Sequence, residues 1–390
     1  MPWRKIEPME QRIEFALKAM GTLNFRALCQ EYGISPKTGY KWKERLLRGG
    51  LDGMVEESRR PRSSPQQLPE EAVCEIVRLK LAHVAWGPRK IRELYRRRHG
   101  EVASESSFKR VLEQVGLTQK RRRRRRGDEA GRLSKGRRAG APNEVWTVDF
   151  KGWWRSWGKR CEPLTVRDEH SRYVLELRAM DNARSESVRR SFERLFERAG
   201  LPQAIRSDNG SPFASVHGLL GLSRLSVWWV ALGIELERGR PGHPQDNGAH
   251  ERMHLDISRE IEALAQSDQE TMDVWRQTFN YERPHESLGM RCPGEIYCAS
   301  KHKYEGTPED LEYPQMCSRR VSAQGAIKLD GQVLFLSKAL AGWSVGLKPI
   351  TEQTMEVWFG RLRLGEVDLA TSNFFRADIR PKKTAIEPLL

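Results

Sequence analysis

The chain has 390 residues, of which 38% are hydrophobic and 31% charged, so it is long enough for roughly two to four surface-rich domains. It contains no apolar run of about 18 residues, which excludes a transmembrane helix, and its charged start is not typical of a secretory signal. The net charge of +16 favours a polyanionic partner, either a nucleic acid or a membrane surface. Six cysteines without a Cys-x-x-Cys pair indicate reduced thiols and a cytoplasmic location.

Residues 1–50 carry the pattern of a helix-turn-helix domain. Apolar side chains recur at helical spacing from Pro8 to Leu23, a short helix follows Asn24, and a basic helix follows the Ser35-Pro36 turn. The exposed face of the basic helix would enter the major groove, and its candidate DNA contacts are Lys37, Thr38, Tyr40, Lys41 and Lys43. Its other face is expected to pack inward through Trp42, Leu46 and Leu47. The alternative is a three-helix domain that does not bind DNA.

A basic linker at 51–67 leads to a second helical unit at 68–118 with the same plan. Helices are expected at 69–83, 89–98 and 105–115, and Ser104 would cap the last one. Candidate DNA contacts are Ser106, Ser107, Lys109 and Arg110. Two modules on a flexible tether would gain affinity through effective concentration, whereas the alternative is that one of them mediates protein association.

Over half of the excess charge lies in an arginine-rich linker at 119–141. Between Lys120 and Arg138 there are eleven basic and two acidic residues, and the run includes Arg121, Arg122, Arg123, Arg124, Arg125 and Arg126. This stretch lacks the apolar face that a membrane-surface helix needs, so it favours contact with DNA phosphates over a membrane. A linker that only increases solubility is the alternative.

Three carboxylates mark the central segment, 142–300. Asp149 closes a strand from Glu144 to Phe150, and Asp208 follows a second strand at the edge where open sheets place ligands. Glu251 lies on a helix that is expected to begin near Gln245. If the three side chains converge, their charges repel unless cations hold them together. Hard carboxylate oxygens suit magnesium or manganese, and two such ions can assist an in-line phosphoryl displacement.

Two other acids compete for a role in this site. Asp246 is an alternative third carboxylate, but its place at the start of the helix is typical of a cap. Asp168 is a possible fourth acid, although a turn residue that binds nearby backbone is the favoured interpretation.

The carboxylate-bearing stretches resemble the Asp-Asp-Glu signature of bacterial insertion-sequence transposases, whose catalytic core is similar to that of retroviral integrases. Further blocks that resemble this family are Asp168 to Tyr173, Pro212-Phe213, Pro241 to Pro244 and Asn280 to His285. The resemblance covers nearly the whole chain and implies an RNase H-like core. The 42 residues between Asp208 and Glu251 exceed the usual separation, and the excess is expected in a loop or short helix at 214–226.

The resemblance also implies the roles of the site residues. Asp149, Asp208 and Glu251 would be catalytic and would hold two Mg²⁺ (or Mn²⁺) ions. From their positions beside these acids, Asn209, Asn247 and His254 are candidate support residues; His254 needs no ligand role and is expected at the surface.

The remaining pattern predicts a multidomain α+β fold. N-terminal all-α units precede a mixed sheet covered by helices, with further strands at 161–166 and 173–179 and helices at 185–199 and 269–281. Short β-like runs at 318–375, with a hairpin at Asp330-Gly331, predict a small C-terminal β-barrel. Such a domain would assist DNA binding or assembly, or would only add stability.

These features together predict a DNA transposase that binds the ends of its mobile element, cleaves them and joins the 3′-OH ends to target DNA. Its partner would be double-stranded DNA rather than a membrane, and it would act as a homo-oligomer, a dimer or tetramer, in the bacterial cytoplasm. The alternatives are a non-enzymatic DNA-binding regulator with a decayed core, and a metal-dependent nuclease without strand transfer.

Overall fold

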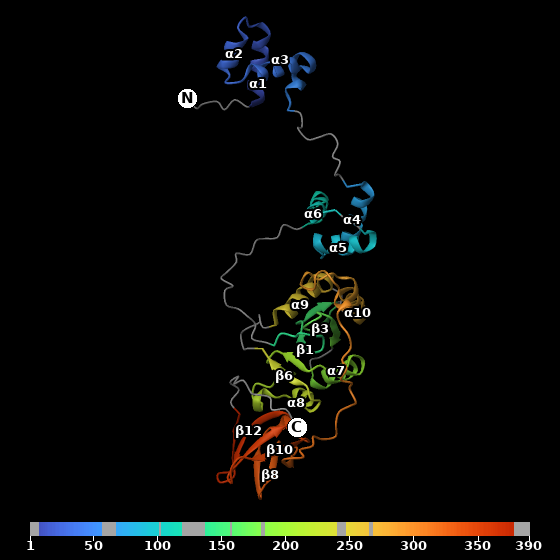
Figure 1. Cartoon of the computed structure of the whole chain (residues 1–390), viewed down its shortest axis with the longest axis vertical. Helices are drawn as coiled ribbons and strands as arrows, with labels where there is room; N and C mark the ends of the chain where they lie inside the picture. Colours follow the sequence, from blue (N-terminus) through green and yellow to red (C-terminus); the bar gives the residue numbers. More distant parts are fainter. Residues whose placement is uncertain are drawn as a thin grey trace. The chain divides into compact units, whose positions relative to one another are not determined.

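The computed structural model describes residues 8–56, 68–100, 103–118, 137–156, 158–180, 184–239, 247–264 and 268–377 (Figure 1). The chain divides after Leu68 into two compact units. The arginines from Arg121 to Arg126 lie outside the described residues, and so does Asp246, the alternative third carboxylate.

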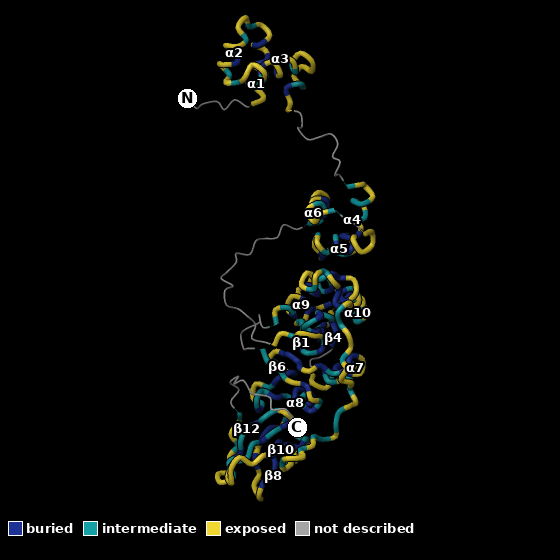
Figure 2. The backbone as a smooth tube through the Cα atoms, viewed as in Figure 1, coloured by how far each residue is buried: buried dark blue, intermediate teal, exposed yellow. Residues whose placement is uncertain are grey.

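The first unit is a three-helix domain formed by α1 (Pro8–Gly21), α2 (Phe25–Glu31) and α3 (Pro36–Gly49), followed by the short 3-10 helix η1 (Gly50–Met54). The side chains of Asn24 and Ser35 accept hydrogen bonds from the first turns of α2 and α3, which fixes where these helices begin. Phe15, Trp42 and Met54 are buried in its core. Figure 2 shows short buried stretches of these helices among exposed ones. Leu47 is 61% exposed, so the expectation that it packs inward is wrong. The face of α3 that packs on the core carries Gly39, Trp42 and Leu46, and Leu47 lies outside this face.

Gly39 lets α3 approach its neighbours closely. A Cβ atom at this position would lie 2.7 Å from Cys29 Sγ and 2.9 Å from Phe15 Cζ. We expect Gly39→Ala to destabilise this domain by about 1–3 kcal/mol through overpacking, with faster amide hydrogen exchange in α1 to α3. Gly49→Ala is the matched control, because no atom lies within 4 Å of its added Cβ. Equal exchange in the two variants would contradict the prediction.

The second helical module opens the second unit and contains α4 (Glu70–Ala82), α5 (Pro88–His99) and α6 (Glu105–Gln114). Ile76, Ile91 and Phe108 are buried, one from each helix. Lys80 is also buried, and its Nζ donates to the backbone oxygens of Val84 and Trp86, which holds the turn between α4 and α5. Ser104 caps α6, as the sequence predicts.

A mixed sheet forms the central segment. Its strands are β1 (Val145–Phe150), β2 (Trp154–Ser156), β3 (Lys159–Asp168), β4 (Val174–Met180), β5 (Ala204–Ser207) and β6 (Glu235–Arg238). They are ordered β2-β3-β1-β5-β6, with β4 paired to β3. β1 is antiparallel to β3 and parallel to β5, and β6 is parallel to β5. The sequence predicted the antiparallel part but not β2 or β6.

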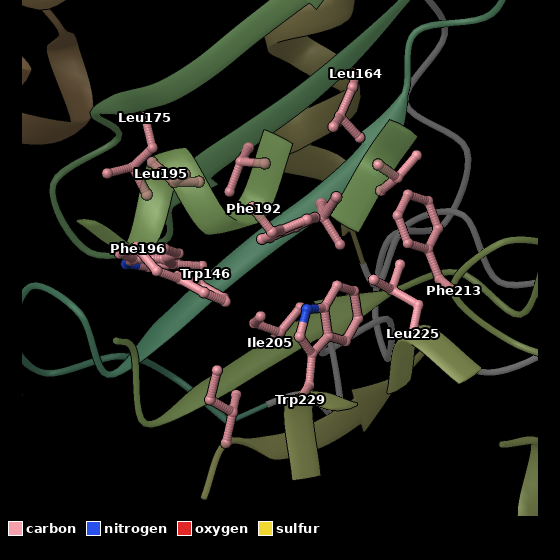
Figure 3. Packing of buried hydrophobic residues seen from close by; sticks show 14 of the residues in the cluster. Trp146, Leu164, Leu175, Phe192, Leu195, Phe196, Ile205, Phe213, Leu225 and Trp229 are labelled. Atoms are coloured by element: carbon pink, nitrogen blue, oxygen red, sulfur yellow. The ribbon is translucent and has the colours of Figure 1, made fainter. Parts of the chain in front are cut away.

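Helices cover both faces of this sheet. On one face, α7 (Ser185–Ala199) and α8 (Arg224–Ala231) pack against Trp146 through buried aromatic side chains, among them Phe192, Phe196 and Trp229 (Figure 3). On the other, α9 (Gly248–Glu260) and α10 (Gln269–Gln277) bury Met253, Ile257 and Trp275 against β4. Alternation along β1 therefore sends Trp146 and Val148 to the aromatic core, and leaves Thr147 and Asp149 for the side covered by α9.

Short elements complete the central segment. They are η2 (Leu219–Gly221), η4 (Glu262–Leu264), the π-helical turn η5 (Thr278–Glu282), η6 (Glu286–Leu288) and η7 (Pro293–Glu295). η2 and α8 occupy the region where the long separation between Asp208 and Glu251 predicted an extra loop or helix.

The C-terminal strands form two antiparallel sheets. The larger is ordered β13 (Asn373–Arg376), β12 (Leu362–Asp368), β11 (Thr354–Phe359), β10 (Ser344–Pro349) and β7 (Cys317–Arg320). The smaller is the predicted hairpin, β8 (Ala326–Leu329) and β9 (Gln332–Phe335), with positive φ at Asp330 and Gly331. β8 contacts β7 and β9 contacts β13, so the sheets enclose one core. In the described part of the chain their hydrogen bonds do not close into the expected barrel, whereas the α+β multidomain class is confirmed.

Candidate active site and DNA-binding surfaces

Asp149 and Asp208 come from neighbouring strands of the mixed sheet. β1 and β5 run parallel, with Val145 opposite Ala204 and Thr147 opposite Arg206. Continuing this register by two residues brings Asp149 beside Asp208, directly after the end of β5. The sheet topology therefore places these two carboxylates at one edge, as the sequence pattern predicted.

The pKa of Asp149 is affected by the charges of the two other candidate acids. Burial, the neighbouring carboxylate of Asp208 and, more weakly, that of Glu251 together raise the pKa of Asp149 to about 7. Its side chain is 27% exposed, whereas Asp208 and Glu251 are exposed residues. The structure thus brings the three acids within electrostatic range, where a proton or a cation favours the arrangement.

Two histidines one helical turn apart hold α9 against the sheet. His250 is fully buried, and its Nδ1 and Nε2 lie 2.7 Å from the hydroxyl oxygens of Thr147 and Thr165. Thr165 also lies 2.9 Å from His254 Nε2 and donates a 2.8 Å hydrogen bond to the backbone oxygen of Asp149. The helix that carries Glu251 is therefore bonded to the strand that carries Asp149.

His250 was not predicted from the sequence, although two signals could have identified it. It precedes Glu251 directly and lies one turn before His254, while Thr147 shares a strand face with Asp149. Burial and the charges of His254 and Arg167 lower the pKa of His250 well below its usual value. His250 is thus held neutral, with both ring nitrogens engaged by threonine hydroxyls.

His254 was expected at the surface, but its side chain is only 13% exposed. Burial, Lys151 and Arg167 lower its pKa to about 3. Its Nδ1 lies 4.0 Å from Asp149 Oδ2. The structure therefore places this predicted support residue between α9 and the first acid.

The other predicted support residues have different surroundings. Asn209 is exposed, and its Nδ2 donates to the backbone oxygen of Gly239 at 2.8 Å, which ties the turn after Asp208 to the end of β6. Asn247 is the N-cap residue of α9, and its buried Oδ1 has no hydrogen-bond partner among the described residues.

Asp168 is a turn residue rather than a fourth acid of this cluster. It is fully buried, and its carboxylate accepts hydrogen bonds from the backbone N–H of Asn143 and Ser171 and from the Ser171 hydroxyl. This network confirms the interpretation that the sequence favoured.

Arg238, at the end of β6, is a basic residue beside Asp208 that the sequence analysis did not identify. Its Nη1 donates to Ser207 Oγ at 2.7 Å and to the Asp208 backbone oxygen at 3.3 Å. Burial lowers its pKa to about 10, and the Asp208 carboxylate opposes that shift. Arg238 thereby fixes the backbone at the second acid.

The donor chemistry of the site fits a divalent cation. The three candidate ligands offer carboxylate oxygens, which hard cations prefer, and their mutual repulsion falls when a cation binds. In the parts of the chain that the structure describes, no three His, Cys, Asp or Glu side chains lie close enough together to hold a metal ion. The acids are therefore grouped at one sheet edge without forming a closed ligand set.

The predicted DNA contacts differ in accessibility. On α3, Lys37, Tyr40 and Lys41 are exposed, whereas Thr38 and Lys43 are half-buried. On α6, Ser106, Lys109 and Arg110 are exposed, whereas Ser107 is half-buried and donates its backbone N–H to Ser104 Oγ. Both helices therefore present basic side chains to solvent. None of the described helices is long and apolar enough to cross a membrane.

Family comparisons cover all three regions of the chain. Two integrase core domain models match residues 139–244 and 232–293. A helix-turn-helix domain model matches residues 11–62, and a homeodomain-like domain model matches residues 38–112. The C-terminal domain of IS481 family transposases matches residues 316–374.

Similar proteins come from insertion elements. An uncharacterized 31.7 kDa protein of insertion element IS407 from Burkholderia multivorans is 29% identical over 247 residues, which cover 62% of this chain and 85% of the relative. An uncharacterized 39.2 kDa protein of insertion element IS476 from Xanthomonas euvesicatoria is 27% identical over 256 residues, which cover 63% of this chain and 70% of that relative.

Among solved structures, the HTLV-2 integrase catalytic core domain in complex with magnesium has 17% identity and a TM-score of 0.34, over 41% of this chain and 100% of that chain. A simian T-cell lymphotropic virus intasome in complex with PP2A regulatory subunit B56 gamma contains a chain with 15% identity and a TM-score of 0.38, over 73% of this chain and 97% of that one.

The mixed sheet and the two integrase-core matches define the class: this is an integrase-core protein. Helix-turn-helix domains precede that core, and the C-terminal domain of IS481 family transposases follows it. The chain thus has the domain types found in insertion-sequence transposases, and the resemblance inferred from the sequence is confirmed. Its domains are those of a DNA-binding polynucleotidyl transferase.

Proposed function

We propose that this transposase binds the ends of its mobile element, cleaves them and joins the freed 3′-OH ends to target DNA. The observation that supports this reaction is the parallel pairing of β1 and β5, which brings Asp149 beside Asp208 at one edge of the integrase-core sheet, with Glu251 near enough to contribute to the raised pKa of Asp149. Two element ends must meet at one target, so the active form is a homo-oligomer, a dimer or tetramer on double-stranded DNA in the bacterial cytoplasm.

The reaction is a pair of phosphoryl transfers. In the first, water attacks a phosphodiester at the element end, the bond to the leaving oxygen breaks, and a 3′-OH is released. In the second, that 3′ oxygen attacks a target phosphodiester, loses its proton, and displaces a target 3′ oxygen that takes up a proton. The number of phosphodiester bonds is unchanged in the second step, so no external energy source is required.

The residues of the chain have distinct roles in this proposal. Asp149, Asp208 and Glu251 would hold two Mg²⁺ or Mn²⁺ ions, which when bound stabilise charge on the attacking and leaving oxygens. Thr165 fixes the backbone of Asp149, and Arg238 fixes that of Asp208. His250 and His254 hold the helix that carries Glu251, Asn209 holds the turn after Asp208, and Asn247 is the N-cap residue of that helix. The exposed residues of α3 and α6 bind DNA, and the arginines at 121–126 contact its phosphates.

Divalent cations should stabilise the free protein by relieving the repulsion among the three acids. At about ten times its dissociation constant, a cation that binds only the folded chain adds about 1.4 kcal/mol. We expect magnesium or manganese to raise the melting temperature of the wild type but not that of Asp149→Asn. In the absence of metal, Asp149→Asn should melt at a higher temperature than the wild type. Asp273→Asn, which removes a carboxylate paired with Arg276 on α10, should keep the full rise. A full metal-induced rise in Asp149→Asn would contradict the assignment.

The test of the function uses labelled duplexes from the two ends of the element, incubated with the full-length protein and magnesium or manganese. Cut and joined products are scored separately, with a chelator as control. Metal-dependent joining supports the proposal. Cleavage without joining would identify a nuclease, and tight DNA binding without cutting in either metal would identify a regulator with a decayed core.

A further inference from the structure

The second helical module contacts the core through Arg97 of α5. Arg97 Nη1 donates to Glu295 Oε1 at 2.8 Å and to Cys292 Sγ at 3.1 Å, and Nη2 donates to the Met290 backbone oxygen at 2.8 Å. The Arg97 side chain is 27% exposed. One guanidinium therefore makes three hydrogen bonds to a short stretch of the core, a larger and more specific contact than a single surface ion pair.

Two further contacts join the same surfaces. Arg89 forms ion pairs with Glu105 of its own module and with Glu286 of the core at 3.1 Å. Buried Trp86 lies under the guanidinium of Arg283, with 5.9 Å between the guanidinium carbon and the ring centroid. Together, Arg283, Glu286, Met290, Cys292 and Glu295 form a surface of the core that we call the docking face.

Arg283 connects the docking face to α9. Its side chain is 3% exposed, and it forms ion pairs with Asp256 at 2.8 Å and Glu260 at 2.9 Å. Both carboxylates belong to the helix that also carries Glu251. Burial lowers the pKa of Lys90, in the module, to about 8. The charges of Arg283, Asp256 and Glu260 also act on this pKa. A charged network thus runs from the module to the helix of the third candidate acid.

The contact leaves the DNA-binding helix of the module accessible. The residues that touch the docking face lie on α5 and on the turn before it, whereas Ser106, Lys109 and Arg110 of α6 are exposed. The module can therefore bind DNA through α6 while α5 remains on the core.

We propose that the docking face binds the second helical module and that this module, with DNA on α6, holds α9 and Glu251 in their working position. The inference rests on the proposed function, to which it adds a positioning role for Arg97. End recognition is thereby coupled to the active site inside one compact unit. Arg97 holds on the core the module whose Trp86 lies against Arg283, and Arg283 pairs with α9. Loss of Arg97 therefore reduces the reaction more than the binding of DNA.

A charge reversal tests this contact in the full-length protein. Arg97→Glu should lower the joining of element ends by about ten-fold or more, because it removes a hydrogen-bonded charge pair and leaves like charges in contact. Glu295→Arg, at a more exposed position, should cause a similar loss. The double variant Arg97→Glu with Glu295→Arg should recover to within about three-fold of the wild type, which loss of folding alone would not produce.

Arg96→Glu is the matched control. Arg96 is the neighbour of Arg97 on α5, and its ion pair goes to Glu93 of the same module. It should change joining by less than about two-fold, and the affinity for end DNA should change by less than about two-fold in every variant. Wild-type joining in Arg97→Glu, or a double variant as weak as the weaker single variant, would overturn the proposal.

Amide hydrogen exchange separates this inference from the proposed reaction. If docking holds α9, exchange at 250–260 should be faster in Arg97→Glu and in Glu295→Arg, and should return toward the wild-type rate in the double variant. This readout needs no catalysis, so it applies even if the wild type neither cuts nor joins DNA. Unchanged exchange in both single variants would overturn the docking role and leave the proposed function untouched.

Discussion

Glu251→Gln is expected to abolish both cleavage and joining of element ends. Glutamine keeps the size of the side chain but offers a neutral amide where the proposed cation site needs a third charged oxygen ligand. Loss of a residue that only supports a metal ligand commonly costs about 10–100-fold in activity or metal affinity, so loss of a ligand should exceed about 100-fold. Because Glu251 is exposed in the first turn of α9, folding should be unaffected.

Glu270→Gln is a close control for this variant. Glu270 is also an exposed carboxylate in the first turn of a helix, α10, and should give wild-type products. The assay scores cut and joined strands over time at equal protein concentration, with end-DNA affinity measured in parallel. A Glu251→Gln protein that joins DNA at more than about a tenth of the wild-type rate would contradict the role of Glu251 as a ligand.

The sequence predicted the location of Asp149 and Asp208 because strand geometry constrains them. Alternation along β1 fixes which residues share a face, and an Asn-Gly turn after β5 fixes the edge at which Asp208 emerges. Parallel pairing of β1 with β5 then brings both acids to the same place. The caps of α2 and α6 were predictable for a similar reason, since Asn24 and Ser104 act on their own first turns.

Contacts between distant elements were not predictable in this way. Periodicity places His254 on the same side of α9 as Glu251, but it does not give the depth at which that helix packs on β1 and β3. The strands β7 and β13 were missed because both contain several exposed polar or basic residues at the edges of their sheet. Arg97 gave no local signal, because its partners lie almost two hundred residues further along the chain.

His250→Phe is expected to destabilise the core and to impair joining. Phenylalanine fills a similar volume but cannot bond to Thr147 or Thr165, so two buried hydroxyl groups each lose a partner. Each hydroxyl keeps another contact, to the backbone oxygens of Arg167 and Asp149 respectively. The free energy of unfolding should therefore fall by about 2–3 kcal/mol in total, near the lower end of the range for two unsatisfied buried groups.

Joining by His250→Phe should fall by about ten-fold or more at temperatures where the protein is still folded, because α9 is no longer fixed against the strand of Asp149. Urea unfolding gives the stability and the end-joining assay gives the rate. His217→Phe is the control, since His217 is exposed between β5 and α8 and should leave both values unchanged. His250→Gln, which can still hydrogen-bond, should retain more stability than His250→Phe. If the two variants were equally stable, packing rather than the bonds to Thr147 and Thr165 would be what His250 contributes.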